Sequence, residues 1–298
     1  MKSANRKHDR QYFYKYMSYE TAKIVLANST LRWSSPLIFN DPFDVPREVL
    51  PDVTDVKIGR ALARKIINEL THPSPNYSDF NHRLQPLFAF FRTMFPNGLP
   101  LELLENFQQL VESPPMGENT GLSIQEFKEV WRTMLKGRRI LCLSTNPFIT
   151  SMWFAYADNY RGVVLRFECS DKLDSAWLLA RPIIYSDDTP LTYTAEGTAN
   201  LLWMKDEDAI RYISHDVTFI KTKNWAPEEE WRLSSYRPED GDKLYSDLGF
   251  HQKELSAVIM GPSFDSDKID ELKSLMNNYP DAGLLSAKIT DHRSIIIE

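Results

Sequence analysis

Short stretches rich in aromatic, β-branched or alternating apolar residues recur along the chain, and such stretches are typical of β-strands. Polar and turn-forming residues separate most of them. The predicted strands cover Tyr12–Met17, Leu31–Ser34, Arg139–Ser144, Val163–Phe167, Pro182–Tyr185, Trp231–Tyr236, Ala257–Met260 and Leu285–Ile289.

Helical spacing of apolar residues replaces this pattern between Asp55 and Lys136. Four helices are predicted there: one around Ala61–Ile67, then Leu84–Phe95, Leu101–Val111 and a helix that a capping-box spacing opens at Ser123 and that runs to Leu135. Outside this block, Ser18 is a good N-cap for a helix to Ala27. Further helices are predicted at Ser151–Ala157, Asp206–Ile213 and Asp267–Met276.

Strands and helices alternate irregularly, without a repeat of βαβ units, which favours an α+β fold over a doubly wound sheet. We expect a single domain over residues 1–298, with residues 55–136 as a helical insertion or lobe set into a mixed sheet. An equally open interpretation makes this block the first half of one continuous domain.

The composition is that of a globular protein, with 298 residues, 42% hydrophobic and 26% charged. A net charge of −6 does not indicate general attraction to nucleic acid, although a local basic groove stays open. Cys142 and Cys169 lie in apolar runs, without the spacing of a disulfide framework or metal site. The N-terminus lacks the apolar region of a signal peptide, so we expect a cytoplasmic protein without a membrane partner.

Several common catalytic motifs are absent from the chain. There is no GxxxxGK, GxGxxG, GxSxG or HExxH, and the six histidines are scattered. A histidine-dependent triad or a zinc site would have to be assembled from distant segments, and we expect no resident metal.

The densest chemistry lies between Lys221 and Leu233, where three carboxylates, two indoles and an arginine share a few positions. Pro227 disfavours a helix just before it, and a strand follows. If the strand begins near Glu228, alternation places Glu228, Glu230 and Arg232 on one face. Glu229, Trp231 and Leu233 then face a core. Two carboxylates beside a guanidinium form either a catalytic group or a structural ion pair, and both interpretations stay open.

Four separated pieces resemble the bacterial domain-of-unknown-function family 2971, over nearly the whole chain from Tyr12 to Gly261. They are the Tyr-Lys-Tyr strand at Tyr14–Tyr16; the Phe-Asn-Asp-Pro-Phe-Asp loop at Phe39–Asp44; the Met-Trp helix at Met152–Ala157; and the Trp-x-x-Glu-x-Glu-x-Arg segment at Trp225–Arg232. The loop and the last segment are the most specific.

A second, weaker similarity is to the ADP-ribosyltransferase fold. A first strand carries a Tyr-(His or Arg)-like pair, here Tyr14-Lys15, and a second strand ends in Ser144 before a helix. A strand that starts at Gly162 follows, and a later strand begins with a Glu-x-Glu pair. This resemblance implies a mostly antiparallel, split sheet of ADP-ribosyltransferase-like type.

The resemblance also implies NAD as substrate and transfer of ADP-ribose to a macromolecule, with a toxin or phage-defence effector as a reasonable setting. It implies catalytic roles for Glu230, Glu228 and Ser144. The implied cofactor-binding residues are Tyr14, Lys15, Tyr16, Trp153, Tyr156, Trp225, Arg232, Asn40 and Asp41. Lys15 stands where the transferases have His or Arg, which leaves another nucleotide or an inactive relative open.

Two other functions stay open. One is a metal-dependent nuclease or phosphodiesterase that uses Asp41, Asp44, Glu228 and Glu230. The other is a non-enzymatic module whose aromatic pocket binds a nucleotide or a protein. The acceptor of a transferase stays open between protein and nucleic acid. The transferase interpretation requires Tyr14, Ser144 and Glu230 to meet in one cleft.

Overall fold

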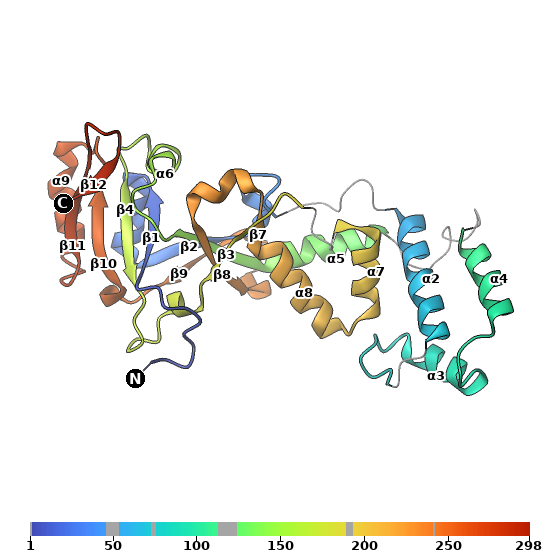
Figure 1. Ribbon diagram of the computed structural model, residues 1–298. Coiled ribbons are helices and arrows are strands. Elements are labelled where there is room, and N and C mark those ends of the chain that lie inside the picture. Colours follow the sequence, from blue (N-terminus) through green and yellow to red (C-terminus); the bar gives the residue numbers. More distant parts are fainter. Residues whose placement is uncertain (1, 46–53, 73–75, 113–123, 189–192, 241) are drawn as a thin grey trace. The chain divides into compact units, whose positions relative to one another are not determined.

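The computed structural model describes residues 2–45, 54–72, 76–112, 124–188, 193–240 and 242–298. The chain forms two compact units, each built from separated segments (Figure 1). The first unit combines Met1–Asp44, Leu135–Ser186 and Lys221–Glu298, and the second combines Val45–Met134 and Asp187–Ile220.

The first unit is built on a sheet of ten strands within the described residues. The order is β12-β11-β10-β4-β1-β3-β2-β9, while β8 pairs with β3 and β5 pairs with β8. Only β10 and β11 are parallel, which confirms the predicted α+β class with a mostly antiparallel sheet. The strands are β1 (Tyr12–Met17), β2 (Thr30–Ser34), β3 (Arg138–Ser144), β4 (Val163–Glu168), β5 (Arg181–Pro182), β8 (Glu230–Tyr236), β9 (Tyr245–Gly249), β10 (Leu255–Met260), β11 (Gly283–Ile289) and β12 (Ile295–Ile297). A small separate sheet pairs β6 (Ile184–Tyr185) with β7 (Ile220–Lys221).

Three strands, β1, β2 and β8, pair with β3, and this arrangement splits the sheet. β8 pairs with β3 over its whole length and so occupies one of its two edges. β1 and β2 therefore share the other edge, where β1 meets Ser144 and β2 meets Ile140. Between these two contacts, the main-chain carbonyl of Cys142 accepts a hydrogen bond from Lys15 Nζ at 2.8 Å. The sheet is thus split between β1 and β2.

Helices cover both faces of this sheet because successive strand residues point to opposite sides. Leu165 of β4 packs in the same core cluster as Leu26 of α1 (Tyr19–Asn28) and Leu272 of α9 (Ile269–Met276). The neighbouring Val164 packs in a second cluster with Trp153 of α6 (Thr150–Ala155). The predicted N-cap is confirmed, since Ser18 Oγ accepts from Thr21 N–H.

The second unit contains helices only among its described elements. They are α2 (Asp55–Thr71), α3 (Gln85–Met94), α4 (Leu101–Glu112), α7 (Ala195–Trp203) and α8 (Asp206–Phe219), with most of α5 (Ile124–Gly137). Ile58 and Ala61 of α2 pack with Ala195 and Ala199 of α7. The predicted helical lobe at 55–136 is therefore joined by a second segment, residues 187–220. The capping box predicted at Ser123 lies outside the described residues.

Most predicted elements of the sheet are present, but β7, β9, β12 and α7 were not predicted. β7 has only two residues, β9 has the polar, glycine-ended sequence Tyr-Ser-Asp-Leu-Gly, and β12 is a short run of isoleucines. Across the described residues, we find no helix that combines the length and the apolar character needed to cross a membrane.

Gly162 provides a test of the packing at the start of β4. Its N–H donates to the Ala157 carbonyl, and a Cβ at this position would lie 2.3 Å from the Met17 carbonyl oxygen. Because that oxygen belongs to the main chain of β1, Gly162→Ala should lower the free energy of unfolding by about 1–3 kcal/mol in urea denaturation. Gly283→Ala is the control, since its Cβ would come no closer than 4.0 Å to Ser256 O. Equal stability of the two variants would contradict this packing.

Candidate functional site

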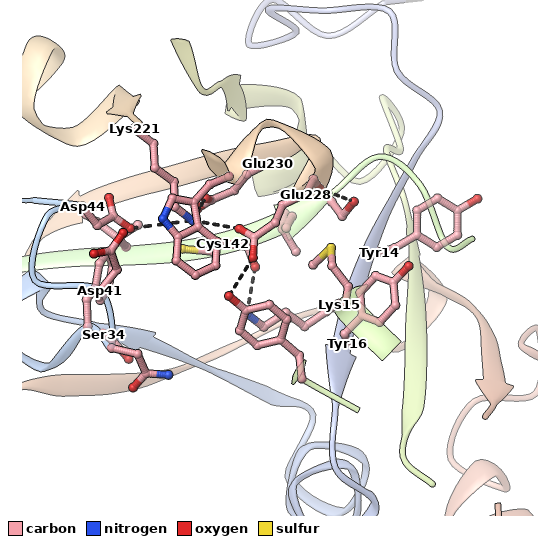
Figure 2. Close-up of a pocket in the computed structure, with 18 of the residues that line it drawn as sticks. Tyr14, Lys15, Tyr16, Ser34, Asp41, Asp44, Cys142, Lys221, Glu228 and Glu230 are labelled. Atoms are coloured by element: carbon pink, nitrogen blue, oxygen red, sulfur yellow. Dashed lines mark hydrogen bonds and ion pairs between the residues drawn. The ribbon is translucent and has the colours of Figure 1, made fainter. Parts of the chain in front are cut away.

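A cavity of about 320 Å³ lies in the first unit where the sheet splits (Figure 2). It is bounded by β1, by β3, by the loop that follows β2, by the C-terminal end of α6 and by the Lys221–Glu230 segment. In Figure 2, Asp41 and Asp44 lie on one side of this cavity, and Tyr14, Lys15 and Tyr16 lie on the other. The lining residues include Tyr14, Lys15, Tyr16, Ser34, Phe39, Asn40, Asp41, Asp44, Cys142, Ser144, Met152, Tyr156, Lys221, Trp225, Glu228 and Glu230.

Tyr14, Ser144 and Glu230 form a row across three neighbouring strands. Tyr14 of β1 is paired with Ser144 of β3, and Ser144 is paired with Glu230 of β8. All three residues line the cavity. The three positions that the sequence analysis required to meet in one cleft therefore do so.

Glu228 reaches the cavity differently from the prediction, whereas Glu230 lies on the strand as predicted. The segment Lys223–Glu228 is a 3₁₀ helix, and Glu229 follows it in the left-handed conformation with φ 47°. β8 therefore begins at Glu230 rather than near Glu228. Glu229 is exposed and accepts from Asn146 and Thr145, so its predicted core-facing position was wrong. The left-handed residue changes the direction of the chain, so strand alternation does not apply to Glu228.

Lys221 joins the carboxylates of Glu228 and Glu230. Its Nζ lies 2.8 Å from Glu228 Oε2 and 2.9 Å from Glu230 Oε2, and only 6% of the side chain is exposed. The same ammonium lies 4.6 Å from the centre of the Trp225 ring, in cation–π range. A buried ammonium is thus stabilised by two carboxylates and an indole.

Arg232 has no exposed side-chain surface and forms the second half of this cluster. Its Nε donates to Glu230 Oε1 at 2.6 Å, and one Nη donates to Glu230 Oε2 at 3.2 Å and to Asp44 Oδ2 at 2.6 Å. Two cations, Lys221 and Arg232, therefore face three carboxylates. Removing such charges from water is unfavourable unless they are paired and hydrogen-bonded, and here they are.

The pKa values of Glu230 and Asp44, the two carboxyl groups that pair with Arg232, are shifted in opposite directions. Burial alone would raise the pKa of Glu230, but attraction to Arg232 and Lys221 outweighs it and lowers that pKa to about 2. Burial raises the pKa of Asp44, and Arg232 offsets this only in part. The carboxylates also raise the pKa of Lys221 against the effect of burial. Glu230 and Lys221 are accordingly both charged near neutral pH.

Neutral hydroxyl groups fix the remaining positions of the two glutamates. Tyr156 Oη donates to Glu228 Oε1 at 2.8 Å, and burial raises the pKa of this phenol. Tyr185 Oη accepts from the Glu230 N–H at 2.8 Å. Ser144 Oγ donates to the main-chain carbonyl of Glu228 at 2.8 Å. Ser144 therefore positions the segment that carries Glu228 through its main chain.

The predicted binding residues of β1 all line the cavity. Tyr16 is buried, and its hydroxyl donates to the Asn146 carbonyl, whereas Tyr14 is half-buried. Strand alternation places Lys15 on the face opposite to Tyr14 and Tyr16. The split in the sheet lets its side chain reach the cavity beside the Cys142 carbonyl.

Among the other predicted binding residues, Trp225, Tyr156, Asn40 and Asp41 line the cavity. Trp153 is fully buried, donates from Nε1 to the Pro147 carbonyl and packs against Tyr16 in the core. Trp153 is therefore the core-facing residue of α6 and lies outside the cavity lining.

The loop of the cavity ends in two aspartates with incomplete partners. Asp41 Oδ1 accepts from Phe43 N–H at 2.8 Å, which forms an Asx-type turn. Asp41 Oδ2 and Asp44 Oδ1 are both buried and have no hydrogen-bond donor among the residues that the structure describes. Within the part of the chain that the structure describes, no three His, Cys, Asp or Glu side chains are placed to hold a metal ion.

Lys221 and Tyr185 were missing from the predicted site, and Asp44 appeared only in the metal-dependent alternative. Lys221 precedes Glu228 by seven positions, and an acidic pair so close to a lysine is a detectable signal. Tyr185 gave no such signal, because its role depends on how residues 183–185 lie against the start of β8.

One comparison with known proteins gives a match. Residues 152–233 match the family model described as "Protein of unknown function (DUF2971)". The matched range contains most of α6, Tyr185, Lys221 and the Glu228–Arg232 segment, whereas β1 and the Phe39–Asp44 loop lie outside it. The resemblance is therefore shown for part of the chain only. Neither the curated proteins nor the solved structures include a match.

The depressed pKa of Glu230 predicts how stability depends on pH. A carboxyl whose folded pKa is lowered from 4.5 to about 2 stabilises the fold above its unfolded pKa, and this contribution is lost as the pH falls through that window. Glu230→Gln should cost about 3 kcal/mol at pH 7, because Arg232 and Lys221 lose a partner, and less at pH 3. The contribution of Asp44 to stability depends on pH in the opposite way. Because its pKa is raised in the folded protein, Asp44 favours the fold more at low pH than at high pH.

Urea denaturation of the wild type and of Glu230→Gln at pH 7, 5, 4 and 3 measures how the stability cost of the substitution depends on pH. Glu229→Gln is the matched control, because its exposed carboxylate lies outside the Arg232 cluster. A penalty for Glu230→Gln that is the same at every pH would show that Glu230 is not held as a low-pKa anion.

Proposed function

We propose that the cavity binds NAD and that the protein transfers ADP-ribose from it to a macromolecule. The observation that carries the proposal is the row Tyr14–Ser144–Glu230 across β1, β3 and β8, in one cavity. These are the positions that the similarity to ADP-ribosyltransferases singles out. The split between β1 and β2 further supports this fold type.

The chemistry requires a carboxylate that remains ionised beside the reacting sugar. In the transfer, the bond between ribose C1′ and the nicotinamide nitrogen breaks, and nicotinamide leaves with the electron pair. The acceptor's nucleophile then bonds to C1′ and loses a proton. The sugar passes through an oxocarbenium-like state, which a fixed negative charge stabilises. Glu230, with a pKa of about 2, keeps this charge throughout the physiological range.

The rest of the cavity supplies aromatic surface and a cation. Tyr14, Tyr156 and Trp225 offer rings for a planar base. Lys15 lines the cavity, and its recorded partner is a neutral carbonyl rather than a carboxylate, so its charge remains available to a phosphate. A volume of about 320 Å³ is near the lower end of small-molecule sites. We therefore propose that it encloses the nicotinamide-ribose half and that the adenosine half extends outward.

The metal-dependent nuclease has less support. Its four carboxylates would have to coordinate an ion, but Glu228 and Glu230 already accept from Lys221, and Asp44 accepts from Arg232. Asp41 and Asp44 alone retain unpartnered oxygens. Nucleic-acid cleavage that EDTA abolishes would favour this alternative over ADP-ribosyl transfer.

The test is nicotinamide release from NAD, followed by chromatography. Glu230→Gln should lower the rate by about 100-fold or more, because the variant lacks the negative charge beside the sugar. Since this variant is also expected to be less stable, folding is checked by circular dichroism and the assay is run well below its unfolding temperature.

Glu229→Gln serves as the matched control and should keep the wild-type rate. Its side chain is exposed and bonds to Asn146 and Thr145. Unchanged nicotinamide release by folded Glu230→Gln protein would overturn the catalytic assignment. Absence of release by the wild type with any acceptor mixture would overturn the transferase itself.

A further inference from the structure

Hydrogen-bond donors are unevenly distributed over the three buried carboxylates. Both oxygens of Glu230 accept, one from Arg232 and the other from Arg232 and Lys221. Both oxygens of Glu228 also accept, from Tyr156 and Lys221. Within the described ranges of the chain, Asp44 accepts from Arg232 through Oδ2, and Oδ1 has no donor. The acceptor without a partner in this cluster therefore belongs to Asp44.

This unpartnered oxygen is unfavourable as it stands. The Asp44 side chain is 6% exposed, and Oδ1 itself is buried. A buried acceptor without a donor loses its hydration and gains nothing in return, so such groups are rare and usually mark a place for a ligand or a water. Asp41 Oδ2, three residues earlier on the same cavity wall, is in the same condition.

The surroundings of Asp44 favour a neutral donor over a cation. Arg232 Nη2 lies 2.6 Å and Lys221 Nζ 4.0 Å from Asp44 Oδ2, so two positive charges already face this carboxylate. A third cation in contact with it would be repelled by both. A hydroxyl group can donate to Oδ1 without adding charge, and sugars present hydroxyls in pairs.

We infer that Asp44 binds a hydroxyl group of the nicotinamide-side ribose, an assignment that rests on the proposed function. The ribose is thereby held beside the Arg232 cluster, in which Asp44 and Glu230 share one nitrogen of Arg232. Glu230 acts through its charge, and Asp44 supplies the hydrogen-bond acceptor. Asp44 is thus the specificity-determining residue for a ribose over a deoxyribose.

Calorimetric titrations completed before measurable turnover test this inference. The ligands are NAD and two analogues that lack the 2′- or the 3′-hydroxyl of the nicotinamide ribose. The wild type should bind one analogue about tenfold more weakly than NAD, since a hydrogen bond to a charged group is lost. Asp44→Asn should bind NAD about tenfold more weakly and no longer distinguish it from that analogue, because the amide can present a donor where Oδ1 accepted.

Asp171→Asn is the matched control. Asp171 also pairs with an arginine, Arg6, but lies outside the cavity lining, so this variant should discriminate as the wild type does. If Asp44→Asn does not fold, the analogues still decide the question with the wild type alone. Equal wild-type affinity for NAD and both analogues overturns the inference, as does unchanged discrimination by folded Asp44→Asn.

Other outcomes separate this inference from the proposed function. Discrimination between hydroxyls without nicotinamide release would overturn the transfer reaction and leave the role of Asp44 standing. Failure of NAD to bind would overturn both. Binding of Mg²⁺ alone that Asp44→Asn abolishes would assign the unpartnered oxygen to a cation instead of a sugar.

Discussion

Everything at the site depends on the burial of Arg232. A guanidinium cannot give up its proton, so a buried one must be surrounded by acceptors. Here the acceptors come from its own strand, through Glu230, and from the loop after β2, through Asp44. Lys221 then offsets the excess negative charge and brings in Glu228. One buried cation thus connects β8 to the loop after β2, 188 positions away in sequence, and fixes the wall of the cavity.

Much of the fold was predictable from local pattern. The pattern of apolar residues located the first and last residues of β1, β3 and β4 to within one position, and Ser18 predicted the start of α1. Both signals depend only on residues that are close in sequence. The polar strand β9 was not predictable, since its pairing with β2 rather than its own composition makes it a strand. The separation of residues 187–220 from the sheet likewise depends on long-range packing.

The site was predictable as a set of residue types but not as a network. The Glu-x-Glu-x-Arg spacing correctly brought Glu230 and Arg232 together on one face. The left-handed conformation of Glu229 could not be anticipated, because glutamate rarely adopts it without tertiary support. The pairing of Asp44 with Arg232, 188 positions away, was not predicted because it has no local signal. The fold determines which group a buried charge pairs with, so the sequence analysis did not identify ion pairs between distant residues.

The shared edge of β3 has a consequence for how this pocket tolerates change. Its floor is made in part by peptide groups, and Lys15 is held by a carbonyl that every residue at position 142 would present. Substitution of Cys142 would alter the width of the pocket while this contact persisted. Relatives with a different residue at position 142 are therefore expected to accept ligands of different size. Their ligand selectivity can change while the contact between Lys15 and the main-chain carbonyl is kept.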